Sequence, residues 1–271
     1  MSKIELELMT PDEVVAARDA ASVAYVPIGP IEWHGPHLPL GIDALHARAV
    51  AEGVAREVGG VVAPTLYAGS ETVRPDTGPQ SLEAVGLATG QRVVGMDFPE
   101  FPVRSVYFEE SAFGLTVREV VRGLKDNGFE LVVLVNGHGA VNHQRTLRRI
   151  AAEESDERAA VLYAIAFLLS SPSDDPGHAT RYETSLMLAM APELVRVDLL
   201  PPPGESIPYQ DYGIIDGPAF DGSPADGFLL PERDDPRGAS AEEGEQLLRD
   251  EVAAVAGQVR AALDARAGIR A

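Results

Sequence analysis

Short runs of apolar residues alternate with longer amphipathic stretches along the 271 residues of this chain. A short apolar run is typical of a strand that is buried on both faces, whereas an amphipathic stretch is typical of a helix that covers a sheet. This alternation predicts an α/β fold. The sequence has no internal repeat and no linker-like segment, so we expect residues 1–271 to form one domain.

The predicted helices and strands follow one another closely except in two places. Residues 69–111 and 201–237 are rich in Gly, Pro and charged residues. Such long irregular stretches are uncommon in compact domains, and the first is expected to be a functional loop or lid. Thr10, Pro11 and Glu13 form the pattern of a capped helix start. The expected elements are strands at 24–28, 61–67, 131–135 and 160–167, and helices at 10–20, 44–58, 116–126, 142–154, 182–190 and 239–266.

The charge of the chain narrows the choice of partners. Its 22 basic and 42 acidic residues give a net charge of −20. Such a surface repels phosphate backbones and anionic membranes, so we expect no nucleic-acid or membrane partner. No run approaches the ~20 apolar residues of a membrane-spanning helix, and the amino terminus lacks the pattern of a signal peptide. We therefore expect a cytoplasmic protein.

The chain contains no cysteine, so any metal must be held by His, Asp and Glu. A segment stiffened by prolines, residues 28–39 (IGPIEWHGPHLP), follows the first predicted strand. Glu32 and His34 are two residues apart, so in extended chain both point to the same side, where each could meet its own ion. Asp43 begins the next predicted helix. Alone it would more often be an N-cap, but eleven residues after Glu32 we favour a carboxylate that bridges two cations.

A histidine between two glycines follows the clearest predicted strand, where residues 133–139 read VLVNGHG. Flanking glycines allow a sharp turn that brings the His138 imidazole to the edge of the sheet. In an open α/β sheet, ligands bind beyond the carboxyl ends of the strands. A lone histidine at a strand end is usually a satisfied polar residue, but the two glycines favour a ligand here.

A third polar segment, residues 176–185 (PGHATRYETS), stands where a helix is expected to begin. Glu183 has two interpretations. It could be a first-turn carboxylate that complements the helix dipole. Equally, it could bind a metal ion or form a hydrogen bond to a residue that does. His178 could move protons. Spacing alone does not separate these roles.

These three segments, in this order, resemble the creatininase (creatinine amidohydrolase) family. The first, with Asp43, is highly specific and the other two are moderately so, and the resemblance spans residues 24–198. It implies a three-layer α/β/α fold with a mostly parallel central sheet and a site for two divalent metal ions (Zn, Mn or Fe). It also implies hydrolysis of a C–N bond, often in a cyclic amide, and a homohexamer in many members.

The family's ligands can be carried over by position. Glu32 and His138 would bind one ion, His34 the other and Asp43 both. Cations that share a carboxylate lower the pKa of a bridging water, so that hydroxide can attack a carbonyl or amidine carbon near neutral pH. His178 is the expected acid for the leaving nitrogen, because imidazole titrates near neutral pH.

The sequence departs from creatininase in three places. The asparagine that the family has in its second segment is displaced, because Ala140 and Val141 precede Asn142 here. The family's metal-binding glutamate, two residues after the histidine of the second segment, is replaced by Ala140. Glu183 is our candidate replacement, and with His178 it is a candidate catalytic residue. The 70–111 region is longer than in creatininase. We therefore expect a small-molecule substrate other than creatinine: a cyclic amide, a formamide or a related metabolite.

Other functions share the same ligands. Some relatives cleave a peptide bond in a modified precursor peptide, and others open the ring of a cyclic ketone. An inactive relative that serves as an assembly scaffold is a further alternative, motivated by Ala140. A two-metal phosphate-ester hydrolase is disfavoured because the sequence has no Gly-rich phosphate loop.

Three further residues carry weaker hypotheses. His37 could orient Glu32 or Asp43 from behind, which we favour, or it could cap its loop. Trp33 could line the pocket, although a place in the core is favoured. Tyr107 could contact the substrate from the long loop, although such a residue is more often at the surface.

Overall fold

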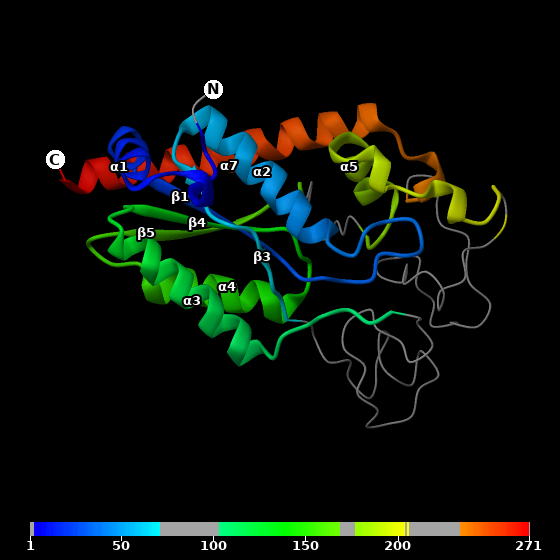
Figure 1. Ribbon diagram of the computed structural model, residues 1–271, viewed down its shortest axis with the longest axis horizontal. Coiled ribbons are helices and arrows are strands. Elements are labelled where there is room, and N and C mark those ends of the chain that lie inside the picture. The colour runs from blue at the N-terminus through cyan, green and yellow to red at the C-terminus, as the bar shows by residue number, and fades with distance from the viewer. Residues whose placement is uncertain (1–2, 71–102, 169–176, 204, 206–233, 271) are drawn as a thin grey trace.

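A sheet of parallel strands lies between two layers of helices in the computed structural model of the chain (Figure 1). α2 (Ile42–Val58) and α7 (Ala241–Arg270) cover one face, and α3 (Glu110–Asp126) and α4 (Val141–Glu154) cover the other. This arrangement confirms the predicted three-layer α/β/α fold. The structure describes residues 3–70, 103–168, 177–203, 205 and 234–270.

The strands run in the order β2 (Val61–Val62), β1 (Val23–Gly29), β4 (Leu131–Asn136) and β5 (Ala160–Ile165), with β3 (Leu66–Tyr67) also beside β1. All described strand pairs are parallel. Ile28 pairs with Asn136, so β1 and β4 end at the same level. The loops that follow these strands therefore start side by side.

The prediction of one continuous strand over residues 61–67 is wrong, because this segment forms two short strands, β2 and β3. β2 pairs with Ala24 and Tyr25 of β1, and β3 pairs with Ile28 and Gly29. Pro64 lies between the two short strands, and it has no N–H to donate to the ladder. A proline here interrupts the pairing.

Each face of the sheet carries its own apolar core, as the two-residue period of a strand requires. Val23 and Tyr25 face α2 and α7, where Val50, Val54 and Val255 are buried. Ala24, Val26 and Ile28 lie in the second cluster, with residues of α3 and α4. Among the described helices, none combines the length and apolarity that crossing a membrane requires.

All six predicted helices are present, with shifted ends. Thr10 accepts a hydrogen bond from the Glu13 N–H and donates its own backbone N–H to the Glu13 side chain, so the predicted capping box is confirmed. α3 begins at Glu110 rather than 116. Residues 71–102 and 206–233, within the two predicted loops, lie outside the described residues. The other helices are η1 (Leu6–Leu8), α1 (Pro11–Ala20), α5 (Arg181–Met190), η2 (Pro192–Leu194), η3 (Val197–Leu199) and η4 (Pro236–Gly238).

Candidate metal centre

The carboxyl ends of β1 and β4 bring the first two polar segments together. The loop after β1 carries Glu32 and His34, the first turn of α2 carries Asp43, and the turn after β4 carries His138. All four side chains are buried, with at most 4% of their surface exposed. Four ionisable groups in one buried cluster require mutual pairing or a bound ion, because an isolated buried charge is costly.

Two glycines allow α2 to start directly against the edge of the sheet. A methyl group on Gly137 would lie 2.0 Å from the Asp43 carbonyl oxygen, and one on Gly29 would lie 2.6 Å from the Asp43 Cβ. Gly41 is the N-cap of α2, so Asp43 lies inside the first turn and is not the cap. The aspartate thus packs closely against Gly29 at the end of β1 and against Gly137 directly after β4.

The two oxygens of Asp43 face different imidazoles. Oδ1 lies 3.2 Å from His34 Nε2, and Oδ2 lies 2.8 Å from His138 Nδ1. Glu32 Oε2 lies 3.4 Å from His138 Nδ1 and 3.7 Å from His34 Nε2. A carboxylate that points one oxygen at each of two donor groups has the arrangement of a bridging ligand.

The donor atoms fall into overlapping sets of three. Within each set they lie within 4.8 Å of one another. Ligands at 2.0–2.2 Å from a tetrahedral ion are separated from each other by about 3.4 Å, and most of the distances between neighbouring donors here are near that value. The spacing therefore fits bound cations. The sets are Glu32, Asp43 and His138; His34, Asp43 and Glu183; and Glu32, His34 and His178.

The hydrogen bonding of His34 favours metal binding through one nitrogen. Its Nδ1 lies 3.1 Å from the Glu32 carbonyl oxygen, to which it can only donate, so Nε2 is left with the lone pair in the neutral ring. Nε2 is buried and has no hydrogen-bond partner in the described part of the chain. It faces Asp43 and, at 3.6 Å, Glu183 Oε1. A buried imidazole nitrogen that faces two carboxylates is a suitable ligand for a cation.

The shifted pKa values of the cluster also favour a cation site. Burial alone would lower the pKa of His34, but the carboxylates of Glu183 and Asp43 outweigh burial and hold this pKa well above its ordinary value. Burial would raise the pKa of Asp43, but His34 and His138 outweigh it and hold that pKa below its usual range. A cation that binds here must displace a proton from the imidazoles, so we expect metal uptake to release protons.

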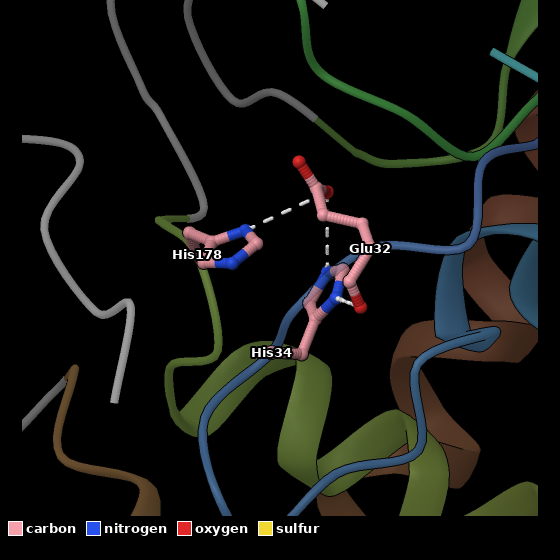
Figure 2. A group of neighbouring side chains, drawn as sticks. All are labelled: Glu32, His34 and His178. Carbon is pink, nitrogen blue, oxygen red and sulfur yellow. Dashed lines mark hydrogen bonds and ion pairs between the residues drawn. The ribbon is translucent and has the colours of Figure 1, made fainter. Parts of the chain in front are cut away.

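The third polar segment reaches the cluster from the start of α5. Glu183 accepts a hydrogen bond through Oε2 from the Ala179 N–H at 2.5 Å, which leaves Oε1 toward His34. His178 Nε2 lies 2.5 Å from the Trp33 carbonyl oxygen, and its Nδ1 lies 3.9 Å from Glu32 Oε2. Figure 2 shows the His178 ring beside Glu32 and His34. The centroids of the His34 and His178 rings lie 4.1 Å apart.

The weaker candidates occupy three different places. Tyr107 donates its hydroxyl to Glu32 Oε1, so it meets the cluster directly. Trp33 is buried, as favoured, and its backbone carbonyl holds His178. His37 lies on neither Glu32 nor Asp43, because its Nε2 bonds to Thr184 Oγ1 at 2.9 Å and its Nδ1 has no hydrogen bond in the described residues. It joins the first loop to α5 instead.

Two residues near His138 were not singled out from the sequence. The Asn136 side chain accepts from the His138 N–H at 3.0 Å and donates to the His138 carbonyl oxygen at 2.8 Å, so it shapes the turn. His143 Nε2 lies 3.0 Å from the same Asn136 Oδ1, and its ring packs edge-on to His138. The sequence could have indicated Asn136, because it directly precedes the Gly-His-Gly triplet. For His143, the only indication was that it lies close to His138 in the sequence.

The protonation of His37 gives a testable pH dependence. Burial, with smaller contributions from His34 and His178, lowers the pKa of His37 to about 3, against 6.5 in an unfolded chain. The unfolded state therefore binds the extra proton as the pH falls from 6.5 to about 3, and the folded state loses stability over that window. The loss attributable to this residue is at most about 5 kcal/mol.

Urea unfolding of metal-free protein at several pH values measures this effect. We expect His37→Gln to flatten the decline in unfolding free energy below pH 6.5 relative to wild type. The comparison isolates this group from the other histidines and carboxylates of the cluster. Parallel curves for the two proteins would contradict the assignment.

Two sequence comparisons identify similar proteins. The family profile described as "Creatininase: Creatinine amidohydrolase" matches residues 7–259. The chain is 28% identical over 267 residues to a creatinine amidohydrolase of Pseudomonas putida, with 91% of each protein covered. It is also 28% identical over 246 residues to a mycofactocin precursor peptide peptidase of Mycolicibacterium smegmatis, with 87% of this chain and 83% of that protein covered.

Solved structures of creatininases share the fold of this chain. A manganese form superposes with a TM-score of 0.63 at 26% identity, covering 95% of this chain and 98% of the other. A crystal structure of creatinine amidohydrolase gives a TM-score of 0.64 at 24% identity, with 96% and 97% covered. A variant of the Zn-Zn type gives 0.63. The creatininase-like fold expected from the sequence is confirmed.

Proposed function

The chain belongs to the creatininase family, and from this premise we propose that it is a dinuclear hydrolase that cleaves a C–N bond of a small cyclic amide, a formamide or a related metabolite. Membership makes it a metal-dependent amidohydrolase. The observation that carries the dinuclear assignment is the position of Asp43, whose two oxygens face two different imidazoles.

Each cation would have its own set of ligands. Glu32 and His138 would hold one, His34 and Glu183 the other, and Asp43 both. Glu183 thereby supplies a carboxylate to the cation that lacks a ligand because of Ala140. Imidazole and carboxylate donors suit Zn, Mn and Fe alike. When bound, such a pair supplies Lewis acidity and a water acidified toward neutral pH.

The carboxylates match the charge of the proposed pair. Glu32, Asp43 and Glu183 together compensate three of the four positive charges of two divalent cations. One positive charge remains, and a hydroxide would neutralise it. Tyr107 strengthens this arrangement, because its bond to Glu32 Oε1 leaves Oε2 turned toward His138.

His178 would handle the proton in the reaction. Hydrolysis joins the oxygen of a water to the substrate carbon, breaks the C–N bond and places a proton on the leaving nitrogen. The bond from His178 Nε2 to the Trp33 carbonyl oxygen fixes the ring and leaves Nδ1 toward Glu32. A proton that Nδ1 takes up from the water can be delivered to the nitrogen, a transfer that typically contributes ~10²–10⁴-fold.

Peptide-bond cleavage is the second candidate. It is favoured by the similarity to the mycofactocin precursor peptide peptidase, which is as identical to this chain, at 28%, as is the creatinine amidohydrolase. Both reactions attack an amide carbonyl and release a nitrogen, so the same ligands and the same proton donor serve either.

The homohexamer found in many members is the assembly that we expect.

Metal analysis combined with a substrate screen tests the proposal. We expect purified protein, reconstituted with Zn²⁺, Mn²⁺ or Fe²⁺, to bind two ions per chain by mass spectrometry of the eluted metal. A panel of cyclic amides, formamides and modified precursor peptides should contain a substrate whose hydrolysis needs the metal. Light scattering measures the assembly. Less than one ion per chain, with no hydrolysis restored by any of the three metals, would instead favour the scaffold interpretation.

A further inference from the structure

A buried charged cluster lies outside the candidate metal centre and joins three helices. The cluster consists of His46 of α2, Tyr182 of α5 and Glu251 of α7. His46 Nε2 lies 2.7 Å from Glu251 Oε2, and the Tyr182 hydroxyl donates to Glu251 Oε1. Both oxygens of one carboxylate are thus bound, each by a different helix.

This cluster is costly to bury. Glu251 has no exposed surface and His46 has 3%. Burial would lower the pKa of His46, but the Glu251 carboxylate outweighs it and holds that pKa above its ordinary value, so the two form an ion pair. Buried ion pairs add little net stability compared with apolar residues of similar size, and one well-attested role is to fix a particular arrangement.

The two partners of Glu251 sit beside two proposed ligands. His46 follows Asp43 by one turn of α2, and Tyr182 directly precedes Glu183 on α5. The carboxylates of Glu183 and Asp43 both help to raise the pKa of His46, so the cluster lies within electrostatic reach of the ligands. Fixing His46 and Tyr182 to one carboxylate therefore fixes the distance between the starts of α2 and α5.

We propose that Glu251 is a positioning residue for the second cation, holding α5 against α2 so that Glu183 completes the set with His34 and Asp43. This inference rests on the proposed dinuclear function. The two cation positions differ in what they need. The set of Glu32, Asp43 and His138 takes nothing from α5, whereas the other set depends on it. Loss of the cluster should therefore affect one position and spare the other.

The test is a Co²⁺ titration of metal-free protein, followed by visible absorption and by metal content after gel filtration. We expect Glu251→Gln to keep the first site at wild-type affinity and to weaken the second by about 10–100-fold, the usual effect of removing a group that supports a ligand. Tyr182→Phe, which removes one donor and keeps the ring, should shift the second site in the same direction by less.

Val255→Ala is the matched control. Val255 lies one turn further along α7 than Glu251 and is buried in the core between α7 and the sheet. Its apolar side chain takes no part in the hydrogen bonds among His46, Tyr182 and Glu251. Its truncation should lower the unfolding midpoint and leave both sites at wild-type affinity. This separates a positioning role from a general loosening of the helix.

The outcomes separate the two hypotheses. If wild-type protein binds fewer than two ions, the proposed dinuclear function fails whatever Glu251 does. If wild type binds two, the positioning role is overturned by equal weakening of both sites, by no weakening in Glu251→Gln, or by the same loss in Val255→Ala. Should Glu251→Gln not be recovered folded, the second-site affinity of Tyr182→Phe decides: unchanged affinity overturns the inference.

Discussion

Replacing Asp43 with alanine should remove both cations and abolish turnover while the fold stays largely intact. Its two oxygens face His34 Nε2 and His138 Nδ1, so each proposed cation loses a ligand in a single substitution. Removing metal-based stabilisation worth several kcal/mol corresponds to a fall in kcat on the order of 10³-fold or more. Metal content and turnover of the reconstituted variant measure the effect, with circular dichroism to monitor the fold.

Asp12→Ala is the matched control for this prediction. Asp12 is an exposed carboxylate in the first turn of α1, as Asp43 is a buried one in the first turn of α2. The control removes an acidic group from an equivalent helical position, and should keep two ions and full turnover. Retained activity in Asp43→Ala would refute the bridging role. Loss of one ion only would make Asp43 a ligand of a single cation.

The second large effect is expected for His178→Ala, which should keep both ions and lose about 10²–10⁴-fold in kcat. The two donor sets that share Asp43 do not include His178, whereas its Nδ1 lies 3.9 Å from Glu32 Oε2, at the edge of the cluster. The measurement is metal content alongside steady-state kinetics. Loss of a proton donor lowers kcat at full metal content, whereas loss of a ligand lowers both kcat and metal content.

Glu183→Gln supplies the contrast from the same helix start. It removes a proposed ligand, so we expect loss of one ion together with loss of turnover. If His178→Ala also lost an ion, the third donor set, Glu32, His34 and His178, would be the functional one. His178 would then be a ligand and the proton donor would have to be sought elsewhere.

The convergence of the first two segments could be predicted because it follows from strand order alone. Glu32 and His34 follow β1, and His138 follows β4, whose last residue Asn136 pairs with Ile28. Parallel neighbouring strands deliver their following loops to one edge of the sheet. A run of apolar residues ending in a polar triplet is enough to predict that much.

Other parts of the site depend on contacts that no local pattern encodes. His37 looked like a support for the ligands, yet its partner Thr184 lies 147 positions further along the chain. Glu251 is 205 positions from His46, on a helix predicted only as an amphipathic cover. A charged residue on such a helix is ordinarily solvent-exposed, so nothing in the sequence distinguishes this glutamate from its neighbours. The divided strand around Pro64 was detectable, because proline cannot donate to a ladder.

The contact of Gly29 and Gly137 with Asp43 restricts how this centre can diverge. At these two positions every side chain larger than hydrogen collides with the main chain or Cβ of the aspartate. The position of Asp43 relative to the ends of β1 and β4 is therefore set by the main chain. A change of substrate specificity would have to come from segments that do not make these contacts.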